Sequence, residues 1–200
     1  MTRVAMILAI ALAFLTQTAR AEDMKPDGKG FIRNWLLLAP IAVANDEGGG
    51  ELDKQQIPDE AKLAPKEGDK VKVGDKELVW KKIQAKEFYF DINELLGGQN
   101  DNVVCYAVCY VTAEEEMKGL EMGVSSNDQA KVYMNGKEVF RFDGTRQLEE
   151  GQDVVNQMTL KKGVNTIVFK IQNCENNWQG ALRFMKGDAP VKNLKVSLTK

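Results

Sequence analysis

Apolar side chains alternate with polar ones along most of the chain after residue 70. The clearest stretch is 166–172, where the apolar Ile167, Phe169 and Ile171 alternate with Lys170 and Gln172. A period of two puts successive side chains on opposite faces of an extended strand. The pattern therefore predicts strands with one face in a core and the other toward water, and it predicts no long amphipathic helix.

Turn-forming residues interrupt the alternation at a spacing of about 8 to 12 residues, which is typical of β-sandwiches. Between them the sequence predicts strands at 35–41, 71–73, 78–83, 88–92, 103–112, 120–124, 154–160, 166–172, 181–185 and 194–198, with a further pair within 131–142. These are enough for two sheets packed face to face. The predicted fold class is all-β, an antiparallel β-sandwich.

An Asn-Gly pair at 135–136 predicts a hairpin within 131–142. Both residues tolerate the positive φ values of a type I′ turn, and β-rich sequence flanks them on each side. A two-residue loop would set Val132 opposite Val139, both inside, and Tyr133 opposite Glu138.

A second hairpin is predicted between the strands at 154–160 and 166–172. The connection, Lys161-Lys162-Gly163, is short, and its glycine can adopt positive φ. Two strands joined this closely are expected to be neighbours in one sheet.

The first 21 residues predict a signal peptide. Arg3 precedes an apolar run of twelve residues at 4–15, and Ala19-Arg20-Ala21 is a small-x-small cleavage pattern. The run is shorter than the roughly 20 residues of a membrane-spanning helix, so a membrane anchor is the less favoured alternative. We expect a secreted or periplasmic protein with no membrane span in the mature chain, in which residues 22–200 form a single β-sandwich domain.

Residues 44–70 depart from the alternation. The segment is rich in Gly, Asp, Glu, Lys and Pro and has few residues to bury. It predicts a long loop insertion, with a helical turn at about 58–63.

The charge of the chain argues against nucleic acid as a partner. Removing residues 1–21 takes away two arginines and no acidic residue, so the net charge falls from −2 to −4. The lysines are interleaved with acidic residues, which is typical of a solvated mixed surface. Nucleic-acid binding normally requires a basic excess or a basic stripe.

Histidine is absent from the whole chain. Its absence removes the commonest general base, the usual triad partner and the usual zinc ligand. Acidic runs such as 114–116 and 149–150 flank expected turns, and solvated surface is their favoured interpretation. No phosphate-binding loop or nucleophile elbow is present. We expect no catalytic residues and no metal site built on histidine.

Three cysteines raise the question of a disulfide. Cys105 and Cys109 lie four apart on one predicted strand, a separation of about 13 Å. A disulfide tolerates only about 7 Å between Cα atoms, so these two cannot pair with each other. At most one of them could pair with Cys174, and burial as small hydrophobic residues is the favoured interpretation for at least one of the three.

Three segments resemble motifs of galactose-binding-like jelly-roll domains, including the sugar-binding domain of family-two glycoside hydrolases. Residues 123–137, which read GVSSNDQAKVYMNGK, resemble the pattern GSDDGxxVWLNGK, and they are also similar to protective-antigen-type lectin domains with an Asp-Asp pair. Residues 160–178 resemble LKAGxNxLLLKVxNxxGxW, and residues 35–40 resemble the opening WLVLGPF. The resemblance implies a jelly-roll sandwich that often serves as a carbohydrate-binding module in secreted planctomycete-type bacterial proteins.

The resemblance also implies a ligand site at Asn127 and Asp128. In the family pattern an acidic pair at this loop could hold a calcium ion or bind sugar hydroxyls. Here Asn127 replaces one carboxylate and Gln129 replaces a glycine, so a calcium ion remains an alternative to no cofactor. A turn in which Asn127 and Asp128 bond their own backbone is the favoured structural alternative.

Trp178 is the candidate aromatic platform for a sugar ring. It lies in a polar segment with Asn176 and Asn177, and sugar recognition combines an aromatic face with convergent polar groups. The competing interpretation is a tryptophan that caps the core. Trp35 and the pair Tyr106 and Tyr110 are expected to be buried.

The predicted function is that of an exported non-catalytic module that binds carbohydrate or another cell-envelope component. The alternative is a protein-interaction or envelope-scaffold module, whose partner would be an envelope protein. A carboxylate-based glycoside hydrolase is a less favoured third hypothesis, because it needs two acids about 5 to 10 Å apart in a cleft.

Overall fold

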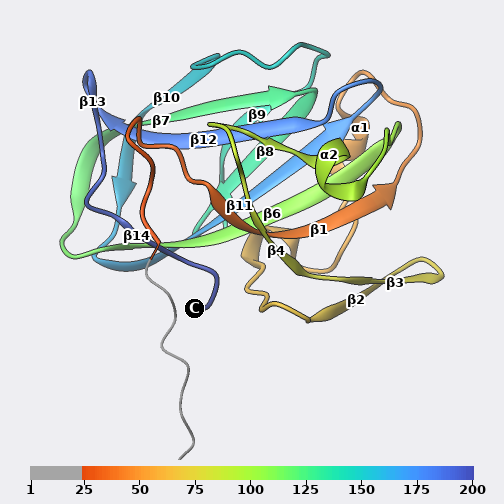
Figure 1. Cartoon of the computed structure of the whole chain (residues 1–200), viewed down its shortest axis with the longest axis horizontal. Coiled ribbons are helices and arrows are strands. Elements are labelled where there is room, and N and C mark those ends of the chain that lie inside the picture. Colours follow the sequence, from red (N-terminus) through yellow and green to blue (C-terminus); the bar gives the residue numbers. More distant parts are fainter. Residues whose placement is uncertain (1–23) are drawn as a thin grey trace, which may run out of the picture.

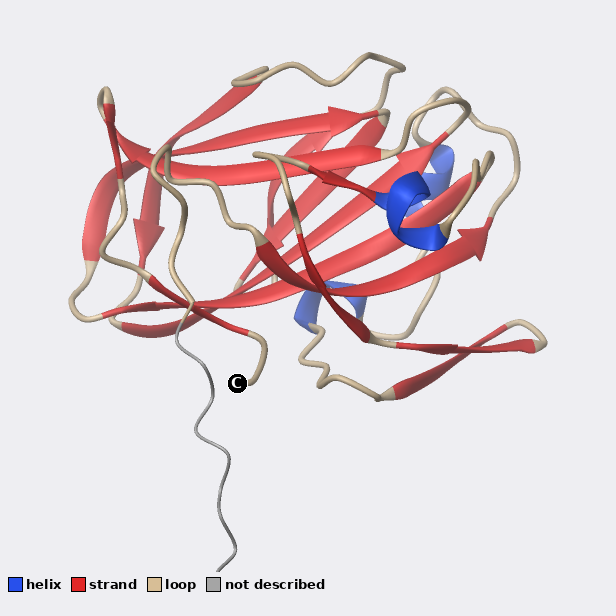
Figure 2. Cartoon of the chain, in the orientation of Figure 1, coloured by secondary structure: helices blue, strands red, loops and turns tan. Residues whose placement is uncertain are grey.

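The computed structural model describes residues 24–200, so the predicted signal peptide at 1–21 lies outside the described residues. Two antiparallel sheets form the layers of a β-sandwich (Figures 1 and 2), which confirms the predicted fold class. The first sheet contains, in spatial order, β4 (Lys81–Gln84), β1 (Asn34–Ala42), β6 (Val103–Ala113), β11 (Gly163–Asn173), β8 (Gln129–Met134) and β9 (Lys137–Phe142), and β14 (Lys195–Ser197) also pairs with β6.

The second sheet contains, in spatial order, β10 (Asp153–Leu160), β7 (Met117–Asn127), β12 (Gln179–Lys186) and β13 (Ala189–Pro190), and β5 (Phe90–Asp91) also pairs with β12. A separate ribbon of β2 (Lys70–Val73) and β3 (Lys76–Val79) projects from the sandwich (Figure 1). The helices are short: α1 (Gly50–Asp53), α2 (Ile92–Leu96) and the 3₁₀ turn η1 (Glu60–Lys62). Among residues 24–200, no helix has the length and apolar character needed to cross a membrane.

The core lies between the two sheets and contains the residues that the alternation predicted. Ile167, Phe169 and Ile171 of β11 are fully buried. Across the interface, Gly180 of β12 faces two of them, and a β-carbon at this position would overlap Ile171 Cδ1 and lie 3.1 Å from Phe169 Cε1. The absence of a side chain at position 180 therefore allows the sheets to approach closely. Trp35 is also fully buried, as predicted.

The predicted hairpin between 154–160 and 166–172 is wrong. Both strands exist as β10 and β11, but β10 pairs with β7 in the second sheet, whereas β11 pairs with β6 and β8 in the first. Gly163 does adopt positive φ, at 89°. The short connection therefore crosses from one sheet to the other. A turn-forming sequence predicts that the chain changes direction, but it does not predict which strand the next strand will pair with.

The hairpin at 135–136 is present, but its register changes after the first pairs. Asn135 and Gly136 have φ values of 53° and 83°, and Tyr133 lies opposite Glu138 as predicted. Val132, however, lies opposite Phe140 instead of Val139. An extra residue at this point forms a bulge, which shifts the register of the rest of β9.

The segment 44–63, which we call the strap, lies against the outer face of the first sheet. The predicted helical turn is present as η1. Lys170 of β11 was expected to face water, but it is fully buried, and its Nζ donates to the carbonyl oxygens of Leu52 and Lys54 at 2.9 and 2.7 Å. The expectation was wrong because the strap covers this face, with buried apolar side chains at Leu52 and Ile57 as well as the polar contacts to Lys170.

A buried carboxylate fastens the strap to the sheet. Glu60 of η1, 3% exposed, accepts hydrogen bonds from the hydroxyls of Tyr106 and Tyr133 and forms an ion pair with Lys170 at 3.0 Å. Burial lowers the pKa of Lys170 and raises the pKa values of both tyrosines.

Tyr110 is fully buried too, and its hydroxyl donates to the carbonyl oxygen of Pro65 at 2.8 Å. The predicted burial of Tyr106 and Tyr110 is confirmed.

All three cysteines are buried and unpaired. Cys105 and Cys109 lie on β6 and are fully buried, which confirms that they act as small core residues. Desolvation raises the pKa of each thiol and keeps it protonated.

Candidate functional site

Asp128 lies between the end of β7 and the start of β8, and the Asn127–Asp128 peptide bond is cis. Its Oδ1 accepts a hydrogen bond from the backbone N–H of Arg146 at 3.1 Å, and its Oδ2 accepts one from the backbone N–H of Cys174 at 3.0 Å. The predicted turn, in which the two residues would bond their own backbone, is therefore wrong for Asp128. The carboxylate instead ties together two segments that are distant in sequence.

Desolvation raises the pKa of the Asp128 carboxyl above its usual value, against the opposing effect of the backbone N–H groups of Cys174 and Arg146. The negative charge of Glu47 acts in the same direction as desolvation. This carboxylate therefore lies in a partly desolvated environment.

Arg146 holds its loop against the end of β7. Its Nε donates to the carbonyl oxygen of Ser126 at 3.1 Å, and its Nη2 donates to Ser126 Oγ at 2.7 Å. The guanidinium also forms an ion pair with Asp153 at 2.6 Å and stacks on the ring of Phe142, 3.7 Å from the ring centroid. Arg146 is thus a fixed structural cation at this end of the sandwich.

These elements surround a polar cavity of about 280 Å³, which we call the loop-end hollow. Its lining combines the strap, the 144–147 loop and the segment after β11, and consists of Glu47, Asp128, Thr145, Arg146, Gln147, Cys174, Glu175 and Asn176. Two of the predicted site residues, Asp128 and Asn176, line it directly. Asn127 and Asn177 reach its wall, because the Nδ2 atom of each donates to Gln147 Oε1, at 3.4 and 3.5 Å.

The fifth predicted site residue, Trp178, has no exposed face. It is fully buried, and its Nε1 donates to the carbonyl oxygen of Ile171 at 3.3 Å. A buried indole cannot stack on a sugar ring, so the prediction of an aromatic platform is wrong and the core-capping interpretation is correct. The segment after β11 directs Trp178 inward, while the neighbouring Asn176 and Asn177 are exposed.

The hollow does not fit a calcium ion. Calcium takes about six to eight oxygen ligands and favours several carboxylates. Both oxygens of Asp128 already accept backbone N–H groups, and Asn127 supplies an amide where the family pattern has a second carboxylate. Among residues 24–200, no group of three or more His, Cys, Asp or Glu side chains is placed to hold a metal ion, the carboxylates of the hollow included.

Sequence reasoning missed four of the lining residues: Glu47, Thr145, Arg146 and Gln147. Glu47 belongs to a segment that was interpreted as a loop with little to bury, and Arg146 follows a turn-like Asp-Gly-Thr run. No periodicity connects either position to residue 128. Glu175 was noticeable only as a neighbour of Trp178.

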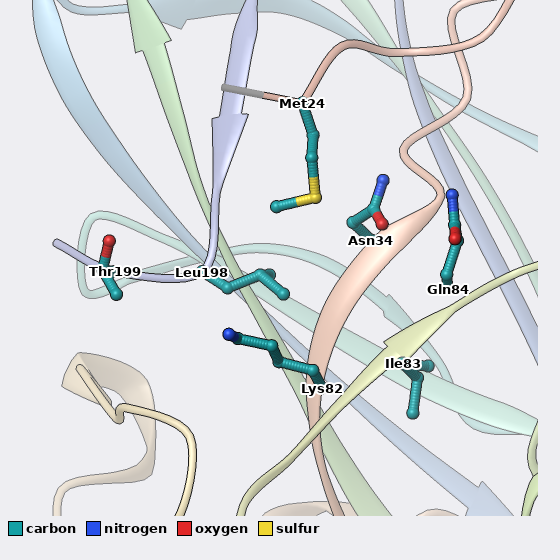
Figure 3. Close-up of a pocket in the computed structure, with 7 residues that line it drawn as sticks. All are labelled: Met24, Asn34, Lys82, Ile83, Gln84, Leu198 and Thr199. Atoms are coloured by element: carbon teal, nitrogen blue, oxygen red, sulfur yellow. The ribbon is translucent and has the colours of Figure 1, made fainter. Parts of the chain in front are cut away.

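A second hollow, of about 300 Å³, lies where the described chain begins and ends. Met24 and Leu198 extend into the space beside the start of β1, with Asn34 and Lys82 around it (Figure 3). It contains none of the predicted site residues. Its lining offers fewer polar groups than that of the loop-end hollow, and we assign it no role.

No protein-family model matches the chain, and no curated protein matches it. Among solved structures, the chain is similar to the crystal structure of the PA14 domain of MpAFP antifreeze protein. The two are 13% identical, the alignment covers 89% of this chain and 96% of that chain, and the TM-score is 0.43.

Proposed function

We propose that this protein is a non-catalytic binding module that recognises a carbohydrate, or another hydroxyl-rich component of the cell envelope, in the loop-end hollow. One observation carries the proposal: four of the five residues singled out in the sequence, Asn127, Asp128, Asn176 and Asn177, gather at this single polar cavity.

The chemistry of the hollow supports a polar ligand. Carboxylates, amides and a hydroxyl line it, and these groups can exchange hydrogen bonds with the hydroxyls of a sugar. No aromatic ring is among its lining residues, all of which belong to the described part of the chain. Recognition would therefore depend on hydrogen bonds and shape instead of stacking on a ring face.

Export belongs to the same proposal and rests on the sequence of residues 1–21. Cleavage before Glu22 would release a mature chain in the periplasm or outside the cell. Expression of the full chain in a secreting bacterial host, followed by intact-mass measurement of the exported protein, tests this. A mass that includes residues 1–21 on exported protein would contradict it.

Binding can be tested by removing one lining side chain without altering the backbone. Asn176 has a φ of 68°, so Asn176→Gly keeps the backbone favourable and removes only the side chain. We expect weaker retention of this variant on polysaccharide affinity gels, with an unchanged Tm. Gln157→Gly is the matched control, because Gln157 also has positive φ, at 59°, and lies on β10 outside the lining of the hollow.

The outcome also separates the alternatives. If the wild type binds no polysaccharide on a glycan array, while cross-linking recovers a specific envelope protein, the hypothesis of a protein-interaction module is correct. If a retained glycan is cleaved, the hypothesis of a glycoside hydrolase is correct. Asp128, Glu47 and Glu175 would then be the acids to examine first.

A further inference from the structure

The ion pair between Glu60 and Lys170 places an amine against a carboxyl group in the interior of the protein. Lys170 Nζ lies 3.0 Å from Glu60 Oε2 and 3.4 Å from Oε1, and both side chains are buried beneath the strap. Two atoms that react with each other are typically about 3 to 3.5 Å apart beforehand. The amine therefore already lies at the carboxyl group, and burial keeps bulk water away from both.

The surroundings of Nζ orient it toward this carboxyl group. Two of its N–H groups donate to the carbonyl oxygens of Leu52 and Lys54, at 2.9 and 2.7 Å. The third N–H therefore points at Glu60. Burial disfavours charged groups, and it lowers the pKa of Lys170. When the third proton passes to Glu60, the lone pair that it leaves on Nζ is directed at the carboxyl group.

Two tyrosine hydroxyls contact the oxygens of this carboxyl group. Tyr133 donates to Glu60 Oε1 at 2.7 Å, and Tyr106 donates to Oε2. Burial raises the pKa values of both tyrosines, so their hydroxyls stay protonated and act as donors. Donors aimed at a carbonyl oxygen stabilise the negative charge that develops there when a nucleophile attacks the carbon. The site thus combines a nucleophile, an acyl group and donors for its oxygens.

We infer that Lys170 and Glu60 form an intramolecular amide bond, for which this ion pair is the reactant state. The lone pair of Nζ attacks Glu60 Cδ, and a bond forms between these two atoms. The bond between Cδ and Oε2 then breaks, and Oε2 leaves as water with the two protons that Nζ gives up. The ammonium and the carboxylate contain every atom of the amide and the water, so no co-reactant is needed.

The bond would attach the strap covalently to the first sheet. Glu60 lies on η1 within the strap, and Lys170 lies on β11, between β6 and β8. The two residues are 110 positions apart, so the amide would close a loop over more than half of the described chain. The strap could then no longer detach from the sheet. This inference goes beyond the proposed function and does not depend on what the loop-end hollow binds.

Intact-mass measurement of the folded full chain, followed by denaturation, tests the inference. We expect the mass to be lower by one water molecule than that of the Lys170→Arg variant, after allowing for the difference between the two side chains. Tandem mass spectrometry of a digest should show a peptide that contains Glu60 joined to one that contains Lys170. A wild-type chain that retains the full mass would overturn the inference, because the two groups would then form an ion pair only.

Lys170→Arg is the matched control, because its guanidinium keeps the positive charge but stays protonated and is not a nucleophile. We expect this variant to keep its full mass. A loss of water that persists in it would come from a different reaction, such as cyclisation at Asp143-Gly144, and would overturn the inference.

The tyrosines supply a second test, on the rate. Tyr133→Phe removes the donor to Glu60 Oε1, and we expect the amide to form about a hundredfold more slowly in chains sampled over time after cell-free synthesis. Tyr110→Phe is the matched control, because the Tyr110 hydroxyl contacts Pro65 and not Glu60. Equal rates in these two variants would overturn the role assigned to Tyr133.

Discussion

Gly180 on β12 and Ile171 on β11 meet across the interface between the two sheets, where any β-carbon at position 180 would overlap Cδ1 of Ile171. The same β-carbon would lie 2.9 Å from Phe90 Cζ and 3.1 Å from Phe169 Cε1. The lack of a side chain at Gly180 thus allows the two sheets to pack closely at this point.

We therefore expect Gly180→Ala to lower the free energy of unfolding by about 1 to 3 kcal/mol, because an overpacked core forces its neighbours off their preferred rotamers. Chemical denaturation measures the change. Gly98→Ala is the control, because a β-carbon there would meet nothing within 4 Å. Equal stability of the two variants would show that the sheets can separate without cost.

Lys170→Met should lower the free energy of unfolding by about 3 to 5 kcal/mol, because it leaves the buried carboxylate of Glu60 without its ion-pair partner. Proteolysis should then begin in the strap, which Lys170 also holds through two backbone carbonyl oxygens. Lys162→Met, at an exposed position, should stay within about 0.5 kcal/mol of the wild type. A loss of less than 1 kcal/mol at position 170 would contradict the prediction.

Three of the four tyrosines should ionise above their usual range. Burial raises the pKa of Tyr110 to about 12, and it raises those of Tyr106 and Tyr133 as well, with Glu60 adding to the effect. Absorbance at 295 nm during an alkaline titration follows the phenolates directly. A titration in which all four tyrosines ionise together near pH 10 in the folded protein would be incompatible with this burial.

The same shifts predict that stability declines at alkaline pH. A folded pKa above the unfolded value means that the protonated tyrosine stabilises the fold, fully below about pH 10 and less as the pH rises through the folded pKa. Lys170, whose pKa is lowered, acts in the opposite direction, but it opposes the three tyrosines and also the three buried cysteines, whose pKa values are raised from 9.0. The midpoint of urea denaturation should therefore fall above about pH 9.

Asp128→Asn should destabilise the loops around the hollow. Both carboxylate oxygens accept backbone N–H groups, and an amide would direct its own N–H groups at one of those donors. The expected loss is about 1 to 3 kcal/mol. Hydrogen exchange should show that protection is lost first at the N–H groups of Arg146 and Cys174, whereas Asp188→Asn, at an exposed position, should leave both protected.

The alternation of side chains predicted the sandwich and the inward face of β11, because burial between two sheets acts on every second residue of a strand. It could not predict whether the opposite face of β11 is exposed or buried. Lys170 follows the pattern of a solvated residue, yet the strap, which is more than 100 residues away in sequence, covers it. The alternation within a strand predicts which face of the strand is apolar. It does not predict whether a segment distant in sequence covers the other face.

The candidate site shows the same limit. Asn127 and Asp128 were found from a local motif, and Asn176 and Asn177 from a polar run. Trp178 was misplaced because the sequence of a short segment does not fix which way each side chain points. Arg146 was missed because its partners, Ser126 and Asp153, lie on two other segments that only the tertiary fold brings together.

The position of β11 in the first sheet constrains how the chain can assemble. β11 begins at Gly163, late in the sequence, yet it lies between β6 and β8, both of which precede it. A nascent chain that ends before Gly163 would leave a slot between these two strands, with one long edge of each unpaired. The first sheet can be completed only after most of the polypeptide has been synthesised, because β11 must pair with β6 and β8 last. We therefore expect slow folding.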